Sequence, residues 1–247
     1  MAKEWFELWF DSPYYHILYR KHDEQDAQTA IDNLLGVMDL QPGARVLDLA
    51  CGKGRHARYL ADKGFAVTGL DISDASISYA RQFEHAGLEF YQHDMRHPFR
   101  MRYFDAVFNF FTSFGYFNTD KDHLSALINI SRGLRPGGRL LLDFFNSHYV
   151  AAHLTPEEEQ TIDGIRFTLR RKLDNGYVVK SVDFDHAGRH HHFTERVRLL
   201  ELSDFNAMFQ QAGLRISDTF GDYNLQAFSS SASPRLILVA ETTQPIN

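Results

Sequence analysis

The sequence predicts an α/β protein with a seven-stranded, doubly wound mixed sheet and a small antiparallel β insertion. Three observations support this prediction. Between residues 44 and 145, short apolar segments alternate with helical patterns, which is typical of a parallel sheet covered on both faces. Between residues 165 and 200, the apolar residues alternate in period two instead. The last two apolar segments lie too close together for a helical crossover, so they should pair antiparallel.

Turn and capping residues divide the core into its elements. Ser73 and Thr119 are favourable helix N-caps, and Gly64 and Gly87 are expected to end helices. The predicted strands are 44–50, 66–71, 88–94, 104–111 and 139–145. The predicted helices are 26–38, 54–63, 73–85 and 119–134.

The second half of the chain is expected to hold the insertion. Asn175 and Gly176 are a strong hairpin signal because both readily adopt positive φ. The charge-rich stretch 156–160 is interpreted as a solvated helix start or loop. The insertion then has three predicted strands, at 165–173, 177–186 and 190–200.

The end of the chain should complete the main sheet. Ser203 is the expected N-cap of a helix that stops at Gly213. Two closing strands follow, at 214–220 and 235–241.

The composition bounds the class of protein. The 247 residues are 44% hydrophobic and 23% charged, and no apolar segment approaches the length of a membrane span. The N-terminus lacks a signal-peptide pattern, and the single cysteine, Cys51, excludes an internal disulfide, so a cytoplasmic protein is expected. A net charge of −6 without a basic block argues against nucleic acid as the main partner.

Acidic residues and glycines gather where three predicted strands end. Asp48 closes the first strand before a turn that contains Gly52 and Gly54, where the backbone can approach a ligand closely. Asp71 and Asp94 end the next two strands. Carboxyl ends of parallel strands form the ligand-binding edge of such sheets, so one ligand should meet all three acids. Asp71 is placed to accept both ribose hydroxyls of an adenosine.

Asp94 is expected to accept a hydrogen bond from an adenine amino group, while Met95 packs on the adenine ring.

The glycine turn is also compatible with another class of protein, because residues 52–57 satisfy the G-x-G-x-x-A pattern of dinucleotide-binding proteins. Asp48 argues against that alternative, because its carboxylate would repel a pyrophosphate but attract the ammonium of a methionine moiety.

Taken together, these residues resemble the class I, Rossmann-like methyltransferases that use S-adenosylmethionine. The resemblance covers about residues 40–145 and includes the 104–107 strand and the 134–138 turn. It implies S-adenosylmethionine as the cofactor, S-adenosylhomocysteine as the product, and the following contacts: Asp48, Ala50, Gly52, Gly54, Asp71, Ile72, Asp94, Met95, Asn109 and Phe110. Tyr19, or else Tyr14 or Tyr15, is expected to reach the methionine end of the cofactor from an N-terminal lid, unless these aromatics only pack on the sheet edge.

More loosely, the layout is similar to the methyltransferases that act on amines of nucleotide sugars. That branch has an aromatic N-terminal lid, an antiparallel insertion and a Ser-x-Gly-Tyr or Ser-x-Gly-His turn, and here Ser113 to Tyr116 read Ser-Phe-Gly-Tyr. The resemblance implies methyl transfer to N or O of a small molecule. A nucleic-acid (tRNA) methyltransferase and a non-catalytic cofactor-binding subunit remain alternatives.

Tyr116 is the first candidate for helping a proton leave the acceptor, because of its place in the turn. His148 is the second candidate, because imidazole titrates near neutrality.

Aromatic residues after the fourth and fifth strands either shield the site or simply pack in the core. His190 and His192 should share one strand face, but no further ligand at a recognisable spacing supports a metal, and none is expected.

Four regions follow from these predictions. Residues 1–38 form an aromatic lid and helix, and 39–150 form the Rossmann-like cofactor-binding core. Residues 151–201 form the antiparallel insertion, which caps the acceptor or serves as a dimer surface, so a homodimer is possible. Residues 202–247 complete the core with a helix and an antiparallel strand pair.

Overall fold

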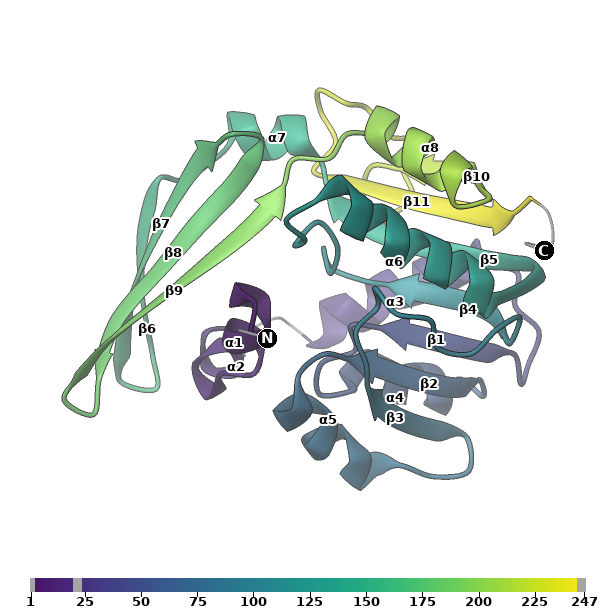
Figure 1. The fold of residues 1–247 in the computed structure, drawn as a ribbon, viewed down its shortest axis with the longest axis horizontal. Coiled ribbons are helices and arrows are strands. Elements are labelled where there is room, and N and C mark those ends of the chain that lie inside the picture. Colours follow the sequence, from purple (N-terminus) through teal and green to yellow (C-terminus); the bar gives the residue numbers. More distant parts are fainter. Residues whose placement is uncertain (1–2, 20–23, 244–247) are drawn as a thin grey trace.

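The structure, a computed structural model, describes residues 3–19 and 24–243. A seven-stranded sheet has the order β10-β11-β5-β4-β1-β2-β3, and a separate four-stranded sheet lies beside it (Figure 1). The strands of the main sheet are β1 (Arg45–Leu49), β2 (Ala66–Asp71), β3 (Leu88–Gln92), β4 (Phe104–Asn109), β5 (Leu134–Phe145), β10 (Leu214–Phe220) and β11 (Arg235–Thr242).

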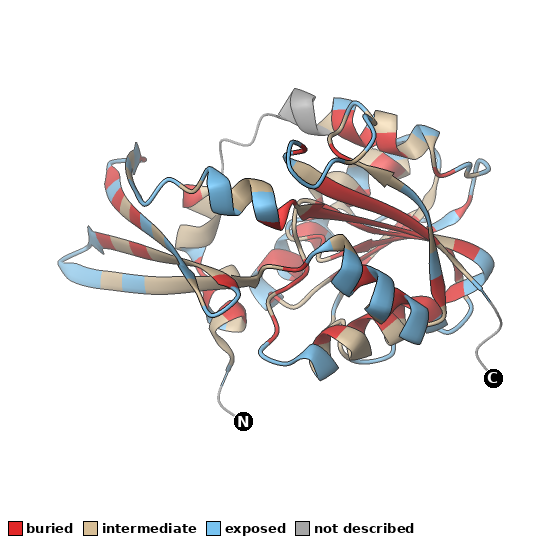
Figure 2. Cartoon of the chain, turned by 90° about the horizontal axis from the view of Figure 1, so that it is seen from above, coloured by how far each residue is buried: buried red, intermediate tan, exposed pale blue. Residues whose placement is uncertain are grey.

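Strands β1 to β5 pair in parallel, whereas β11 pairs antiparallel with both β5 and β10. The predicted mixed sheet and its closing antiparallel pair are therefore confirmed. Every residue of β4 is buried, because helices cover both faces of the sheet (Figure 2).

Two apolar clusters lie on opposite faces of the sheet. Leu47 and Leu142 belong to the cluster that packs under α6 and α8, whereas Val46 and Leu141 belong to the cluster under α3, α4 and α5. The fold is thus doubly wound, as predicted. The helices are α3 (Glu24–Gly36), α4 (Arg55–Asp62), α5 (Asp74–Ala80) with a 3₁₀ turn η1 (Arg81–Phe83), α6 (Asp120–Gly133) and α8 (Leu202–Gln211).

The insertion has four strands, so the prediction of three strands was wrong. The stretch interpreted as a helix start or loop is β6, which pairs antiparallel with β7. Cross-strand ion pairs explain why so acidic a segment extends: Glu157 and Glu159 pair with Arg170 and Arg166. The strands are β6 (Glu157–Ile162), β7 (Ile165–Asp174), β8 (Tyr177–His186) and β9 (Arg189–Arg198).

Two smaller predictions also need correction. The N-cap of α8 is Glu201 rather than Ser203, because Glu201 and Asp204 form a reciprocal capping box. Residues after β5 form a short helix, α7 (Ser147–Ala152), which the sequence pattern did not reveal. The predicted Asn175–Gly176 hairpin is confirmed, with φ of 50° and 78° at these residues.

The N-terminal helices α1 (Trp5–Phe10) and α2 (Pro13–Leu18) lie between the two sheets (Figure 1). Trp9 and Leu18 pack into the apolar face of the insertion, whereas Phe6 joins the core under α6. We call residues 3–19 the lid. Among the described helices, none is long and apolar enough to cross a membrane.

Candidate functional site

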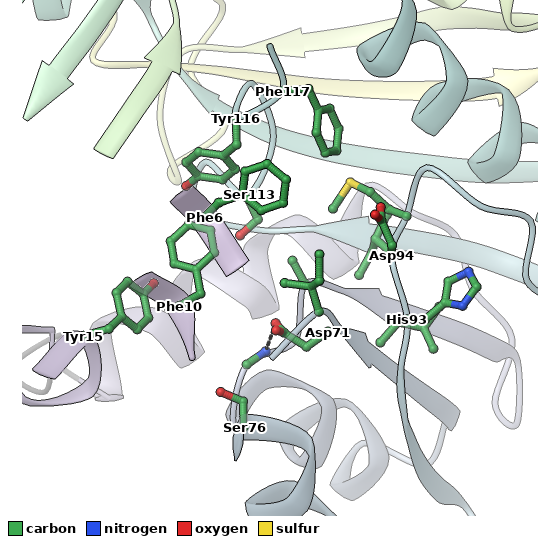
Figure 3. Close-up of a pocket in the computed structure, with 16 residues that line it drawn as sticks. Phe6, Phe10, Tyr15, Asp71, Ser76, His93, Asp94, Ser113, Tyr116 and Phe117 are labelled. Atoms are coloured by element: carbon green, nitrogen blue, oxygen red, sulfur yellow. Dashed lines mark hydrogen bonds between the residues drawn. The ribbon is translucent and has the colours of Figure 1, made fainter. Parts of the chain in front are cut away.

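A cavity of about 730 Å³, partly open to solvent, lies at the carboxyl ends of β1, β2 and β3 beneath the lid (Figure 3). Three parts of the chain contribute to its wall: the strand ends, the loop after β4, and the lid. The lining residues are Phe6, Phe10, Tyr15, Leu49, Ala50, Gly52, Leu70, Asp71, Ile72, Ser76, His93, Asp94, Met95, Ser113, Tyr116 and Phe117.

The turn after β1 brings bare backbone to the cavity wall. Ala50 and Gly52 both line the cavity with positive φ, 62° and 54°. A Cβ on Gly52 would meet nothing within 4 Å, so this position faces open space. Gly54, at φ 79°, caps α4, and a Cβ there would lie 2.6 Å from the Phe90 ring. The glycine at 54 is therefore required by packing rather than by a ligand.

Asp71 joins the ends of β1 and β2. Its carboxylate accepts from the Gly52 N–H at 2.7 Å and from the Ser73 N–H at 2.8 Å. These bonds leave lone pairs of the same carboxylate for a ligand in the cavity. Burial is the main cause that raises the pKa of Asp71, against the opposing effect of these backbone donors.

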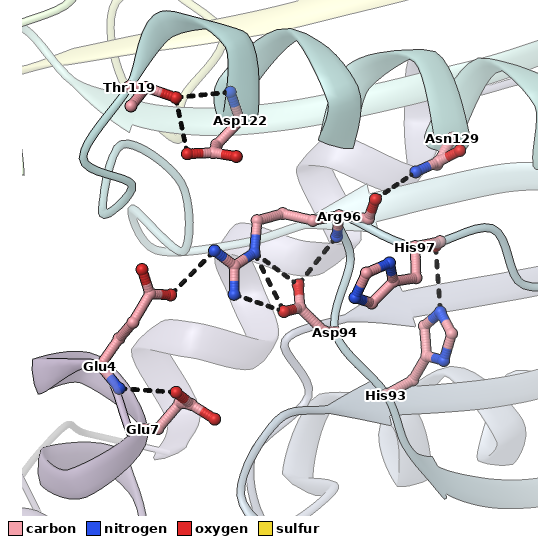
Figure 4. Close-up of polar contacts among 9 residues, drawn as sticks. All are labelled: Glu4, Glu7, His93, Asp94, Arg96, His97, Thr119, Asp122 and Asn129. Atoms are coloured by element: carbon pink, nitrogen blue, oxygen red, sulfur yellow. Dashed lines mark hydrogen bonds and ion pairs between the residues drawn. The ribbon is translucent and has the colours of Figure 1, made fainter. Parts of the chain in front are cut away.

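Asp94 binds Arg96, a residue that the sequence reasoning missed (Figure 4). Partial burial acts to raise the pKa of Asp94, but the bonds from the Arg96 side chain and backbone outweigh it and hold the pKa below its usual range. Arg96 also pairs with Glu4 of the lid at 2.8 Å. The arginine therefore ties the lid to the end of β3.

Asp48 is buried under the turn, with 1% of its surface exposed. Among the described residues, one of its oxygens, Oδ2, has no hydrogen-bond partner. Burial, followed by the nearby charge of Asp71, raises the pKa of Asp48 to about 7. A buried carboxylate oxygen without a donor is costly, and a cationic ligand group would compensate for it.

Tyr116 forms the other end of the cavity. Its hydroxyl donates to the Thr112 carbonyl, and its ring packs edge-on against Trp5 and Phe10 of the lid, at 5.8 and 5.2 Å between centroids. Burial, with the charges of Tyr15 and Glu195, raises the pKa of Tyr116 well above its usual value. The phenol is therefore protonated at neutral pH.

Comparisons with known proteins agree with this geometry. Residues 46–138 match a methyltransferase domain family. The chain is 19% identical to an S-adenosylmethionine-dependent methyltransferase from Clostridium acetobutylicum over 93% of this chain and 96% of that one, with a TM-score of 0.77. An amino pentose methyltransferase from Micromonospora echinaspora, solved with bound S-adenosylmethionine, is 22% identical over 93% and 97%, with a TM-score of 0.71.

The fold of the chain is therefore that of S-adenosylmethionine-dependent methyltransferases, and residues 46–138 match a methyltransferase domain.

Curated relatives differ in how much of this chain they match. A putative methyltransferase of Bacillus subtilis is 39% identical, over 43% of this chain and 44% of its own length. A fatty-acid O-methyltransferase of Mycolicibacterium smegmatis is 41% identical over 40% and 36%. A dTDP-3-amino-3,4,6-trideoxy-α-D-glucopyranose N,N-dimethyltransferase of Streptomyces venezuelae is only 26% identical, but over 82% of this chain and 89% of its own.

Several residues expected at the cofactor or acceptor site line the cavity. They are Ala50, Gly52, Asp71, Ile72, Asp94, Met95 and Tyr116. The cavity is also lined by Ser76 and His93, which the sequence did not single out, and by Ser113, which it indicated only as part of the Ser-x-Gly-Tyr turn. Ser76 lies in the first turn of the helix that Ser73 caps, and this predicted cap was the feature of the sequence that could have pointed to Ser76.

Other expected site residues do not line the cavity, and Asp48, buried under the turn, and Gly54 are among them. Asn109 is fully buried and donates to the Leu49 carbonyl, which holds β4 to β1, while Phe110 stacks on Phe108 in the core. Tyr19 lies outside the cavity lining and donates to Glu195 of the insertion at 2.6 Å. His148 is 56% exposed at the start of α7, where its Nε2 lies 3.4 Å from a Glu201 oxygen.

The histidines of β9 divide between two faces, as strand alternation predicted. His190 and His192 flank Asp183 on the outer face, whereas His191 stacks on Phe184 towards the lid. Within the described residues, no group of three or more His, Cys, Asp or Glu side chains is arranged to hold a metal ion.

Proposed function

We propose that the protein is an S-adenosylmethionine-dependent methyltransferase that methylates the amine nitrogen of a small polar molecule of the amino-sugar class. The observation that carries the proposal is the extent of the match to the sugar N,N-dimethyltransferase, which spans 82% of the chain. The match to the O-methyltransferase spans 40%. Phe6, Phe10 and Tyr15 of the lid line the cavity, so similarity that extends beyond the core bears on the acceptor.

The proposed cofactor site uses the carboxylates at the three strand ends. Asp48 would hold the ammonium of the methionine moiety, Asp71 the ribose hydroxyls, and Asp94 with Met95 the adenine. The unpartnered oxygen of Asp48 and the open space over Gly52 fit such a ligand. When bound, S-adenosylmethionine supplies a methyl group on an electrophilic sulfonium.

The proposed acceptor site lies beside Tyr116. Because the hydroxyl proton of Tyr116 is committed to the Thr112 carbonyl, its oxygen can only accept a further hydrogen bond. An amine N–H is a suitable donor to it. The aromatic rings of Phe10, Tyr15 and Phe117, which also line the cavity, favour a cationic group and exclude water.

The high pKa of Tyr116 defines its proposed part in the reaction. A protonated phenol is not a general base at neutral pH, so Tyr116 would orient the nitrogen lone pair towards the methyl group. Holding the two reactants in line is the main requirement of such a displacement. The proton of the ammonium would then be lost to solvent or to a basic group of the acceptor itself.

A paired-acceptor assay tests the proposal. S-adenosylmethionine with a labelled methyl group is supplied with sugars that differ only in an amino or a hydroxyl group at one carbon, free and as nucleotide conjugates. We expect label and S-adenosylhomocysteine to appear with the amino member of a pair. Equal labelling of the hydroxyl member, or no release of S-adenosylhomocysteine with any pair, would contradict it.

A further inference from the structure

An ionic cluster outside the cavity joins the ends of β5 and β11. The Asp143 side chain has no exposed surface, and its Oδ1 accepts from Arg235 Nε at 2.9 Å and from Nη2 at 2.6 Å. Its Oδ2 accepts from the Phe111 N–H at 2.8 Å and from the Tyr223 hydroxyl at 2.9 Å. All four acceptor positions of this carboxylate are therefore occupied by the protein itself.

The cluster holds a strained piece of backbone. Phe111 and Thr112 follow β4 with φ of 56° and 61°, a left-handed conformation that residues with a Cβ adopt at a cost. Asp143 fixes both, since its backbone carbonyl also accepts from the Thr112 N–H at 2.9 Å. Arg235 adds a bond from Nη2 to Thr112 Oγ1 at 3.0 Å.

The strained bend ends at the tyrosine of the acceptor site. The carbonyl of Thr112 accepts the hydrogen bond of the Tyr116 hydroxyl. Asp143 and Arg235 do not line the cavity, whereas Tyr116 does. The direction of the phenol thus depends on a carbonyl whose orientation is set by the buried ion pair.

We propose that Asp143, with Arg235, is a positioning residue of this methyltransferase: it stabilises the left-handed Phe111–Thr112 bend and thereby directs the Tyr116 hydroxyl at the acceptor. The inference rests on the role proposed above for Tyr116. The buried pair is then retained for the geometry that it imposes on the loop, since a buried ion pair by itself is weak evidence for stability.

Asp143→Asn tests this proposal. An asparagine has the same shape but cannot accept from all four donors, so the bend should relax. Hydrogen exchange at the Phe111 and Thr112 amides, measured by mass spectrometry or NMR, should quicken by about tenfold or more. With an amine acceptor found by the paired-acceptor assay, kcat should fall by about tenfold, while KM and the affinity for S-adenosylhomocysteine change less than about threefold.

A double-mutant cycle separates positioning from general damage. If Asp143 acts through Tyr116, then Asp143→Asn should lower kcat by less than about twofold in a Tyr116→Phe background, because that variant no longer has the hydroxyl to direct. Tyr223→Phe removes one of the four donors without changing a charge, so it should show the same effects in a milder form.

Asp105→Asn is the matched control. Asp105 is also buried, accepts from a backbone N–H (Arg45) and pairs with an arginine (Arg135), but it lies at the opposite end of β4. Its substitution should lower stability without changing exchange at residues 111–112 or kcat.

Two outcomes would overturn the proposal: unchanged exchange at Phe111 and Thr112 in Asp143→Asn, or an equal loss of kcat in the presence and absence of the Tyr116 hydroxyl. Hydrogen exchange at Phe111 and Thr112 can be measured in the absence of a methyl acceptor. A chain that methylates none of the amines would therefore contradict the proposed function and still leave this result decisive for the bend.

Discussion

The two ends of the cavity are built in different ways. At the cofactor end, Asp71 binds the backbone of Gly52 and Ser73, so neighbouring turns position each other through main-chain donors. Where the lid meets the insertion, outside the cavity lining, Trp9 and Tyr19 of the lid both donate at 2.6 Å to Glu195, which is more than 170 residues away in the chain. The first end depends on local motifs, and the second on long-range packing.

This difference has a functional consequence. Glu195 also pairs with Lys180 at 2.7 Å, and both side chains are largely buried, 15% and 12% exposed. The cluster fixes the lid against the insertion without touching the strand ends that would bind the cofactor. Changes at one end should therefore leave the binding properties of the other end intact.

The largest expected effect is at the cofactor end. Asp71→Ala removes the carboxylate proposed to hold the ribose and the acceptor of two backbone N–H groups. We expect a loss of about 2–3 kcal/mol in the binding free energy of S-adenosylhomocysteine, or roughly 30- to 150-fold in affinity, by calorimetry. An affinity within a factor of about three of wild type would show that Asp71 does not contact the cofactor.

A smaller effect is expected where lid meets insertion. Glu195→Gln leaves the largely buried Lys180 without its carboxylate partner, so the free energy of unfolding should fall by about 1.5–2 kcal/mol in chemical denaturation. The KM for the acceptor should rise while the affinity for S-adenosylhomocysteine stays the same. A weakened cofactor affinity would break the proposed independence of the two ends.

Glu159→Gln is the control for this variant. Glu159 belongs to the same sheet and pairs with Arg166, but the two side chains are 46% and 71% exposed. Solvent screens such a pair, so its loss should change the free energy of unfolding by less than about 0.5 kcal/mol.

The smallest expected effect is a pH dependence that comes from Asp48. Its pKa of about 7 means that the carboxyl is mostly neutral at pH 6 and charged at pH 8. If the charged form holds the methionine ammonium, affinity for S-adenosylhomocysteine should rise about tenfold over this interval, and Asp48→Asn should abolish the rise. A wild-type affinity that is flat with pH would contradict the assignment.

The same shift affects the stability of the free protein, and its sign can be stated. Burial favours the protonated form of Asp48 in the native state, whereas the unfolded chain releases this proton near pH 4. As the pH rises from about 4 towards 7, the native state holds a proton that the unfolded state has lost, so stability falls. Thermal unfolding of wild type and Asp48→Asn should diverge over this range.

The core could be predicted from the sequence because its signals are local. Apolar strands, capping residues and glycine turns identified the seven strands of the main sheet and placed Asp71 and Asp94 at one edge. The acidic strand β6 could not be found in this way, since composition alone favours a loop there. Only its pairing with the arginines of β7 explains why it extends.

The sequence by itself determined the fold class, because strand-end carboxylates and a glycine turn are short-range features that fold into one edge whatever surrounds them. Only the tertiary structure decided which distant side chains hold the lid, the insertion and the loop after β4 in place around the cavity. Arg96, Asp143 and Glu195 carry no local signal, and each acquires its part through partners brought from distant segments. Burial makes these partners energetically important, because a charge that is removed from water is costly unless a partner within the fold compensates for it.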